Sequence, residues 1–94
     1  MSNERPEIIF YGRTRFCPDV ARSRARLTEL DIEWTEFDIE ADEDAAQRAE
    51  ALTGMRRVPT IVIGDKILVE PTNTALDAAL EAVGYEIVED EAVR

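Results

Sequence analysis

The sequence predicts an α/β domain in which three helices cover a four-stranded mixed sheet, in the order β-α-β-α-β-β-α. Two observations predict this class. Short apolar runs of β-forming residues alternate with amphipathic stretches of helical periodicity. Two further β runs are separated only by Gly64-Asp65, which is typical of a hairpin. The expected strands cover 7–11, 32–39, 60–63 and 66–69, and the expected helices run from 18 to about 30, from a cap at 42 to about 53, and from a cap at 72 or 73 to about 83.

The first expected strand is short and apolar, which indicates a central, buried place in the sheet. In the second strand, Ile32 and Trp34 are expected to share one face, and Trp34 is expected in the core. The helix from 18 to 30 is expected to bury one face and to turn its arginines outward. The expected inner-face residues are Val20, Ala21, Ser23, Ala25, Leu27 and Leu30, and the expected outward ones are Arg22, Arg24 and Arg26.

The connections between the strands predict helices on both faces of the sheet. Each of the first two connections contains a helix, so we expect two βαβ-type crossovers followed by the terminal hairpin. Only the hairpin must be antiparallel. Gly54 and Gly84 are placed to end the second and third helices.

Length and composition indicate one small globular domain over 1–94, with a core of about 6–84 and an acidic tail over 85–94. The net charge of −10 disfavours binding to nucleic acid or to an anionic membrane. The chain has one cysteine and no histidine, so neither an intramolecular disulfide nor Cys–His catalysis is expected, and no metal site. Residues 1–5 lack the apolar core of a signal peptide, so we expect no export and a monomer in the cytoplasm.

The one cysteine, Cys17, stands where the first helix is expected to begin. Pro18 fits the first helical position, which makes Cys17 the N-cap. Unpaired N–H groups and the positive end of the helix dipole there favour thiolate over thiol. Arg13 and Arg15 add to this effect, whereas Asp19 opposes it. Because the thiolate is the nucleophile, this placement predicts redox chemistry.

A second landmark is Val58-Pro59-Thr60, at the start of the third expected strand. A proline between a loop and a β run is a candidate for a cis peptide bond. The strand followed by Cys17-Pro18, this proline step and the Gly-turn hairpin together resemble the glutaredoxin branch of the thioredoxin fold, over roughly 6–84. The segments 57–60 and 69–73 resemble, in particular, the small bacterial glutaredoxin-like proteins that include mycoredoxins.

The resemblance implies roles for single positions. Cys17 matches the nucleophile, and Pro59 matches the cis-proline that brings backbone beside the active sulfur. The N–H and C=O of Val58 would pair with the backbone of a bound thiol peptide, as an added strand does. The start of the third helix matches the region that receives a carboxylate of the small thiol, here Thr72, Asn73 and Thr74.

Further residues near these positions are candidates for contact with substrate. Arg57, with Arg56, either binds another carboxylate or is a solvated loop residue. Arg13 or Arg15 replaces the basic residue that often precedes the active-site motif. Phe16 could shield the thiol or contact substrate. The aromatic at the end of the first strand, Tyr11, is a candidate to reach the site.

Two departures from the family pattern narrow the expected function. The usual C-x-x-C is Cys17-Pro18-Asp19-Val20 here, so only an external thiol could resolve an adduct on Cys17, which is the monothiol route. Segment 70–73 replaces the Gly-Gly and paired aspartate that are common after the hairpin. The cosubstrate therefore stays open among glutathione, mycothiol, bacillithiol, coenzyme A and a small cysteine derivative.

The leading hypothesis is a monothiol thiol–disulfide oxidoreductase of glutaredoxin or mycoredoxin type, with no tightly bound cofactor. Through Cys17 it would reduce mixed disulfides between proteins and a low-molecular-weight thiol, so its partners would be S-thiolated proteins and small thiols. The alternative is a non-catalytic binding module that docks a partner at the Pro59 edge, since Val20 marks the loss of the resolving sulfur. A dimer bridged by an iron–sulfur cluster, with one Cys17 and one thiol ligand from each subunit, is a third hypothesis.

Overall fold

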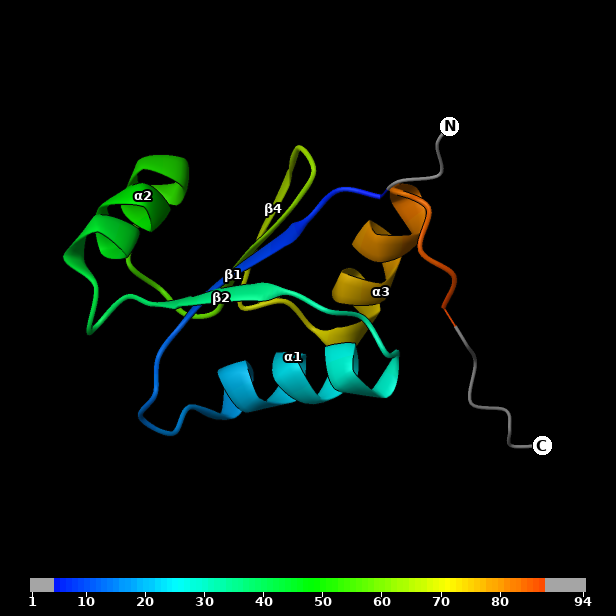
Figure 1. Cartoon of the computed structure of the whole chain (residues 1–94), viewed down its shortest axis with the longest axis horizontal. Helices are drawn as coiled ribbons and strands as arrows, with labels where there is room; N and C mark the ends of the chain where they lie inside the picture. The colour runs from blue at the N-terminus through cyan, green and yellow to red at the C-terminus, as the bar shows by residue number, and fades with distance from the viewer. Residues whose placement is uncertain (1–4, 88–94) are drawn as a thin grey trace.

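An apolar strand runs through the middle of the sheet in the computed structural model, which describes residues 5–87. The strand order is β2-β1-β3-β4, and three helices surround the sheet (Figure 1). The strands are β1 (Ile8–Gly12), β2 (Thr35–Asp38), β3 (Thr60–Ile63) and β4 (Lys66–Val69), and the helices are α1 (Pro18–Glu29), α2 (Glu43–Thr53) and α3 (Asn73–Ala82). The predicted α/β class and element order are confirmed. Of the tail expected over 85–94, residues 88–94 lie outside the described part.

The pairing of the strands agrees with one expected crossover and contradicts the other. β1 and β2 are parallel neighbours joined through α1, as expected. β3, however, lies antiparallel on the other side of β1, with Thr60 opposite Tyr11. The connection through α2 therefore begins and ends at the same end of the sheet. The expectation failed because a helix within a connection permits a parallel return but does not require one.

Turn and cap residues stand where the sequence predicts them. The Asp42 carboxylate accepts a hydrogen bond from the first turn of α2, and the Thr72 hydroxyl does the same for α3. Gly54 ends α2 in the left-handed region, at φ 79°. Gly64, in the hairpin, also has a positive φ of 63°. Within residues 5–87, none of the helices has the length and apolar character that crossing a bilayer requires.

The second strand is shorter than expected because its first residues complete the end of α1. Asp31 adopts a left-handed φ of 60°. The Ile32 N–H donates to the Leu27 carbonyl at 2.9 Å, and the Asp31 N–H donates to the Thr28 carbonyl at 3.0 Å. This is a Schellman motif, with an aspartate where glycine is usual. Ile32 is buried and Trp34 packs at the rim of the core, but neither belongs to the sheet.

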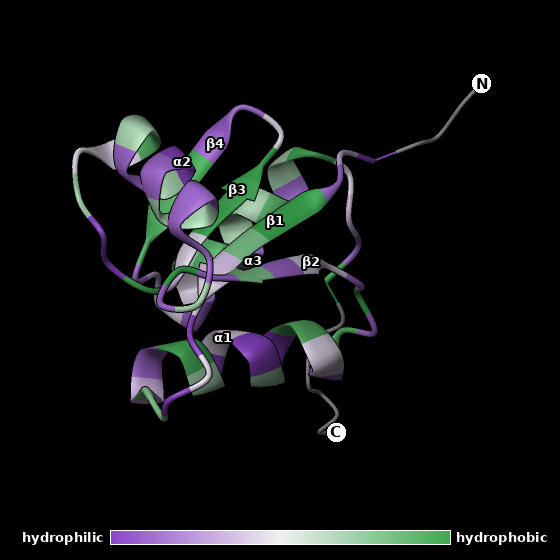
Figure 2. Ribbon diagram, turned by 60° about the vertical axis from the view of Figure 1, so that its left-hand side comes forward, coloured by the Kyte–Doolittle hydropathy of each residue, from purple (hydrophilic) through white to green (hydrophobic). Residues whose placement is uncertain are grey.

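The two faces of the sheet are covered by different helices. Figure 2 shows the central strands β1 and β3 in the colour of hydrophobic residues, between α2 on one side and α1 on the other. Buried residues of the sheet, α1 and α3 form the larger core: Ile8, Phe10, Val20, Leu27, Ile61, Ile63, Leu76 and Leu80 are among them. A smaller cluster under α2 joins Tyr11 to Ala45 and Ala49. Because α2 presents alanines, it lies close against the sheet.

The buried stripe of α1 is narrower than expected. Val20, Ser23 and Leu27 are buried, as predicted, but Ala21 and Ala25 are exposed. The three arginines expected outside are half-buried along the flanks of the helix. The spacing of 3.6 residues per turn places positions 20, 23 and 27 on one face, whereas positions 21 and 25 are turned away from that face by more than about 90°.

Substitutions on α1 test this assignment. We expect Leu27→Ala to lower the free energy of unfolding by about 2–5 kcal/mol, because it leaves a cavity in the core. Ala25→Gln should change the free energy of unfolding by less than about 0.5 kcal/mol, since the side chain enters solvent. Urea unfolding of both variants measures this difference. Equal losses in the two variants would show that the stripe is placed wrongly.

Candidate active site

Cys17 and the Val58-Pro59-Thr60 step lie at the same end of the sheet. β1 and β2 end there, because Gly12 pairs with Asp38 in a parallel ladder. β3 begins there and β4 ends there, because Thr60 stands opposite both Tyr11 and Val69. The loops 13–17, 54–59 and 70–72 therefore meet at this end, which we call the thiol end of the sheet.

Cys17 is the N-cap of α1, as the sequence predicts. Its backbone is extended, with φ −148° and ψ 120°, and Pro18 opens the helix. The Cys17 carbonyl accepts the Ala21 N–H at 2.9 Å, whereas its sulfur makes no capping hydrogen bond. The side chain is half-buried and packs against the core cluster that contains Val58. The thiol is thus held at the positive end of α1 without a capping bond of its own.

The predicted cis peptide bond is present between Val58 and Pro59. Pro59 is fully buried, and its carbonyl accepts the Glu70 N–H at 2.8 Å. The buried Thr60 hydroxyl donates to the Arg57 carbonyl at 2.8 Å. These two bonds fix the chain on either side of the proline and connect it to the loop that leads into α3.

Two arginines of the loop before Cys17 are held by Glu40. Arg15 forms two hydrogen bonds to the Glu40 carboxylate, at 2.9 and 2.5 Å. These bonds lower the pKa of Glu40 and raise the pKa of Arg15. The charge of Cys17 makes a smaller contribution that also raises the pKa of Arg15. Arg13 donates to the Phe16 carbonyl at 3.1 Å and lies 3.9 Å from Glu40. Arg13 thus shapes the loop before Cys17, and Arg15 joins that loop to Glu40.

The same loop is anchored to β2 by Asp38. The Asp38 carboxylate accepts the Thr14 hydroxyl at 2.5 Å and the Thr14 N–H at 3.0 Å. It also accepts the N–H groups of Glu40 and Ala41. The bond from the Thr14 hydroxyl is the largest cause that lowers the pKa of Asp38. The charged form of Asp38 therefore holds the loop between β1 and α1.

The charge of Asp19, which opposes a thiolate, is balanced within α1. Its carboxylate lies 2.9 Å from the Arg22 guanidinium, which also donates to the Pro71 carbonyl at 3.2 Å. Pro71 is buried in the loop between β4 and α3. Arg22, expected to face solvent, thus connects the helix that carries the thiol to the start of α3.

The remaining predicted binding residues differ in how they are placed. Thr72 is the N-cap of α3, and its hydroxyl accepts the Ala75 N–H at 3.1 Å. Asn73 opens α3 and is exposed. Arg57 pairs with Glu70 at 3.3 Å. Phe16 is 77% exposed next to Cys17, which leaves its ring free to meet a partner.

Two residues that the sequence offers as candidates for the site, Tyr11 and Arg56, lie away from Cys17. Tyr11 does not reach the thiol, because its ring stacks on Phe37 in the cluster under α2. The expectation failed because successive residues of a strand point to opposite faces. Arg56 is engaged by Glu43 and Glu50 of α2 rather than by the loop beside Cys17.

The sequence did not predict the contacts of Arg24, which reaches the loop before Cys17. Arg24 binds the Glu36 carboxylate, which also accepts the Trp34 indole N–H at 2.9 Å. Arg24 further donates to the Arg13 carbonyl at 3.0 Å. Its pKa is raised chiefly by Glu36, with a smaller contribution from Cys17. No motif links position 24 to position 36, so only the fold shows this contact.

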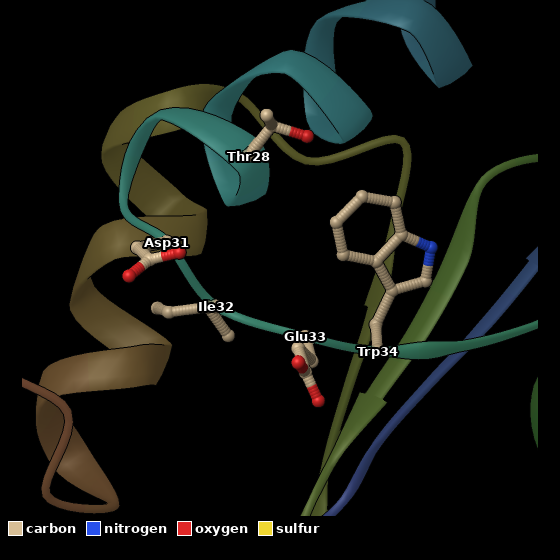
Figure 3. A pocket seen from close by; sticks show the side chains of 5 residues that line it. All are labelled: Thr28, Asp31, Ile32, Glu33 and Trp34. Atoms are coloured by element: carbon tan, nitrogen blue, oxygen red, sulfur yellow. The ribbon is translucent and has the colours of Figure 1, made fainter.

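A well-formed pocket lies away from the thiol end. It has a volume of about 380 Å³ and lies at the other end of α1, between Thr28 and Trp34 (Figure 3). The 12 residues of α1 separate this pocket from Cys17 by roughly 18 Å. Among residues 5–87, no group of three His, Cys, Asp or Glu side chains is placed to hold a metal ion.

Comparison with known proteins agrees with this geometry. The glutaredoxin family model matches residues 8–68, and the chain belongs to the glutaredoxin family. The family consists of thiol–disulfide oxidoreductases of the thioredoxin fold that use glutathione as cosubstrate, so this chain has the fold and the general chemistry of that class. A search of the curated proteins found no match.

Several solved structures are similar to this chain over most of its length. Glutaredoxin (grx-1) from Archaeoglobus fulgidus has a TM-score of 0.69 and 21% identity, covering 80% of this chain and 86% of its own. Glutaredoxin from Brucella melitensis has a TM-score of 0.59 and 29% identity, covering 85% and 83%. A buckwheat glutaredoxin–glutathione complex has a TM-score of 0.62 and 22% identity, covering 88% and 83%.

The loop anchor at Asp38 predicts a pH dependence. The pKa of Asp38 is lowered by folding, so its contribution to stability is present above the ordinary carboxyl value of about 3.9 and is lost as pH falls through the folded value. Asp38→Asn should therefore be less stable than wild type at pH 7, and the difference should shrink below about pH 4. Thermal unfolding from pH 7 to pH 3 measures it.

The matched control is Glu81→Gln, which removes an exposed carboxylate of α3 far along the chain from this loop. Its stability relative to wild type should vary little over the same range. A gap between Asp38→Asn and wild type that persists at low pH would contradict the role given to the Asp38 charge.

Proposed function

We propose that this protein is a monothiol thiol–disulfide oxidoreductase in which Cys17 alone carries the chemistry. The observation that supports this most is the joint placement of two features at the thiol end. Cys17 caps α1 there, and the cis-proline Pro59 begins β3 there. The substrates are mixed disulfides between proteins and a low-molecular-weight thiol, and that small thiol is the cosubstrate. The protein acts as a cytoplasmic monomer without tightly bound cofactor.

The reaction takes place in two thiol–disulfide exchanges. In the first, the Cys17 thiolate attacks the small-thiol sulfur of the mixed disulfide. A bond forms between the two sulfurs, the original disulfide breaks, and the protein leaves as a thiolate that takes up a proton from solvent. In the second, the thiolate of a free small thiol attacks the adduct, which releases a small-molecule disulfide and regenerates Cys17. Two electrons pass from the small thiols to the protein substrate.

Val20 supports the monothiol route. It stands where a dithiol motif carries its second cysteine, and it is 1% exposed in the core under α1. Cys17 is the only cysteine of the chain. No second thiol of the same chain can therefore attack the adduct on Cys17.

Substrate contacts are assigned to the residues around Cys17. The exposed Phe16 flanks the sulfur, and Arg13 and Arg15 shape and charge the loop before it. The backbone of Val58 beside Pro59 pairs with the bound thiol peptide, as an added strand does at a sheet edge. Thr72 and Asn73, at the start of α3, and Arg57 complete the site.

The adduct is the direct test of this proposal. Wild type incubated with a peptide–cysteamine mixed disulfide should release one peptide thiol per chain and gain one cysteamine on Cys17, measured by mass spectrometry. The adduct should persist until free cysteamine is added. Cys17→Ser should show no exchange and no turnover. Full turnover by a folded Cys17→Ser would refute the proposal.

The second candidate function is a binding module that docks an extended peptide at the Pro59 edge. The buried Val20 in place of a resolving cysteine favours it. Under this alternative, wild type and Cys17→Ser should capture the same partner with equal affinity. The enzyme proposal instead expects a disulfide-linked partner that is lost with Cys17→Ser and released by a reductant. Non-reducing electrophoresis of cross-linked complexes distinguishes these outcomes.

A further inference from the structure

Glu70 occupies an unusual position at the thiol end. It directly follows β4 and adopts a left-handed φ of 50°, a region that non-glycine residues rarely enter. Its N–H donates to the Pro59 carbonyl at 2.8 Å, which fixes Glu70 next to the cis-proline. Strained backbone of this kind persists only where the surrounding structure holds it, and it concentrates at functional sites.

The side chain of Glu70 is paired with a cation of the same site. Its carboxylate lies 3.3 Å from the Arg57 guanidinium. The backbone of Arg57 is itself fixed, because its carbonyl accepts the buried Thr60 hydroxyl at 2.8 Å. Both side chains stay partly exposed, at 58% for Arg57 and 35% for Glu70, so they form a charged rim beside Pro59.

Other arginines of the thiol end are occupied in the same way. Arg15 lies 2.5 Å from Glu40, and Arg22 lies 2.9 Å from Asp19. The Arg57 pair is longer than either. A ligand carboxylate that enters beside Pro59 must therefore compete with a carboxylate of the chain, and Glu70 is the competitor closest to the cis-proline.

We propose that Glu70, by holding Arg57, is a specificity-determining residue that selects mixed disulfides whose small-thiol half is neutral or cationic over those whose half bears carboxylates. This inference rests on the proposed function of Cys17 and adds the charge class of the substrate. An anionic half meets the Glu70 carboxylate and must compete with it for Arg57, whereas an ammonium group meets a favourable charge.

The test uses three small symmetric disulfides that differ in charge. They are 3,3′-dithiodipropionate with two carboxylates, hydroxyethyl disulfide with none, and cystamine with two ammonium groups. The rate of adduct formation on Cys17 is measured by mass spectrometry at low ionic strength. Each rate is divided by the rate of free 2-mercaptoethanol with the same disulfide, which removes differences in intrinsic reactivity. Wild type should prefer cystamine, then hydroxyethyl disulfide, then dithiodipropionate.

Variants then assign the preference to Glu70. Glu70→Gln should raise the rate with dithiodipropionate about two- to fivefold relative to hydroxyethyl disulfide, the size of one exposed ion pair. Glu70→Gly, which suits the positive φ, should give the same change if the carboxylate is the cause. The double variant Glu70→Gln with Arg57→Gln should lose the gain, because the freed cation is then absent.

The matched control is Glu29→Gln, which makes the same change in net charge at the far end of α1. It should leave the ratio of the rates unchanged. The gain in Glu70→Gln should also shrink at high salt, because exposed charges are screened. A purely structural effect would not depend on salt.

The outcomes separate this inference from the proposed function. No adduct with any of the three disulfides would overturn the role of Cys17 itself. Adducts with all three, but with wild type fastest on dithiodipropionate, would overturn the charge preference alone. The inference also fails if Glu70→Gln leaves the ratio unchanged, or if Glu29→Gln changes it equally.

Discussion

The pairing of β1 with β3 is the constraint on which the site depends. Because Thr60 stands opposite Tyr11, the residue before β3 must lie beside the loop that follows β1. That register brings a proline and a cysteine 42 positions apart to one end of the sheet. A shift by one residue would turn Ile61 and Ile63 out of the core, so burial of these side chains maintains the register.

Charge at the thiol end is organised as pairs. Glu40, Glu36 and Asp19 each bind an arginine. Arg22 reaches the loop before α3, and Arg24 reaches the loop before Cys17. The pairs thereby fix the loops beside Cys17, and they also neutralise the carboxylates near its thiol. In a chain of net charge −10, such pairing also leaves few cations free for an anionic ligand.

The end of α1 opposite Cys17 shows how local and tertiary effects combine. Ile32 looks like the start of a strand by composition, yet its N–H completes a Schellman motif with Leu27. Asp31 accepts a left-handed conformation there, which glycine would adopt more easily. Burial of Ile32 and Leu27 in one core stabilises that ending. Tertiary burial therefore decided where β2 begins.

The sequence by itself determined the features that arise from neighbouring residues. Caps such as Asp42 and Thr72, the hairpin at Gly64 and the N-cap place of Cys17 depend on side chains within a few positions of each other. Only the tertiary structure decided the antiparallel return of β3, the contact of Arg24 with Glu36 and the hydrogen bond from Arg22 to the Pro71 carbonyl. These depend on which elements pack together, and no local propensity encodes a distance between segments far apart in the chain.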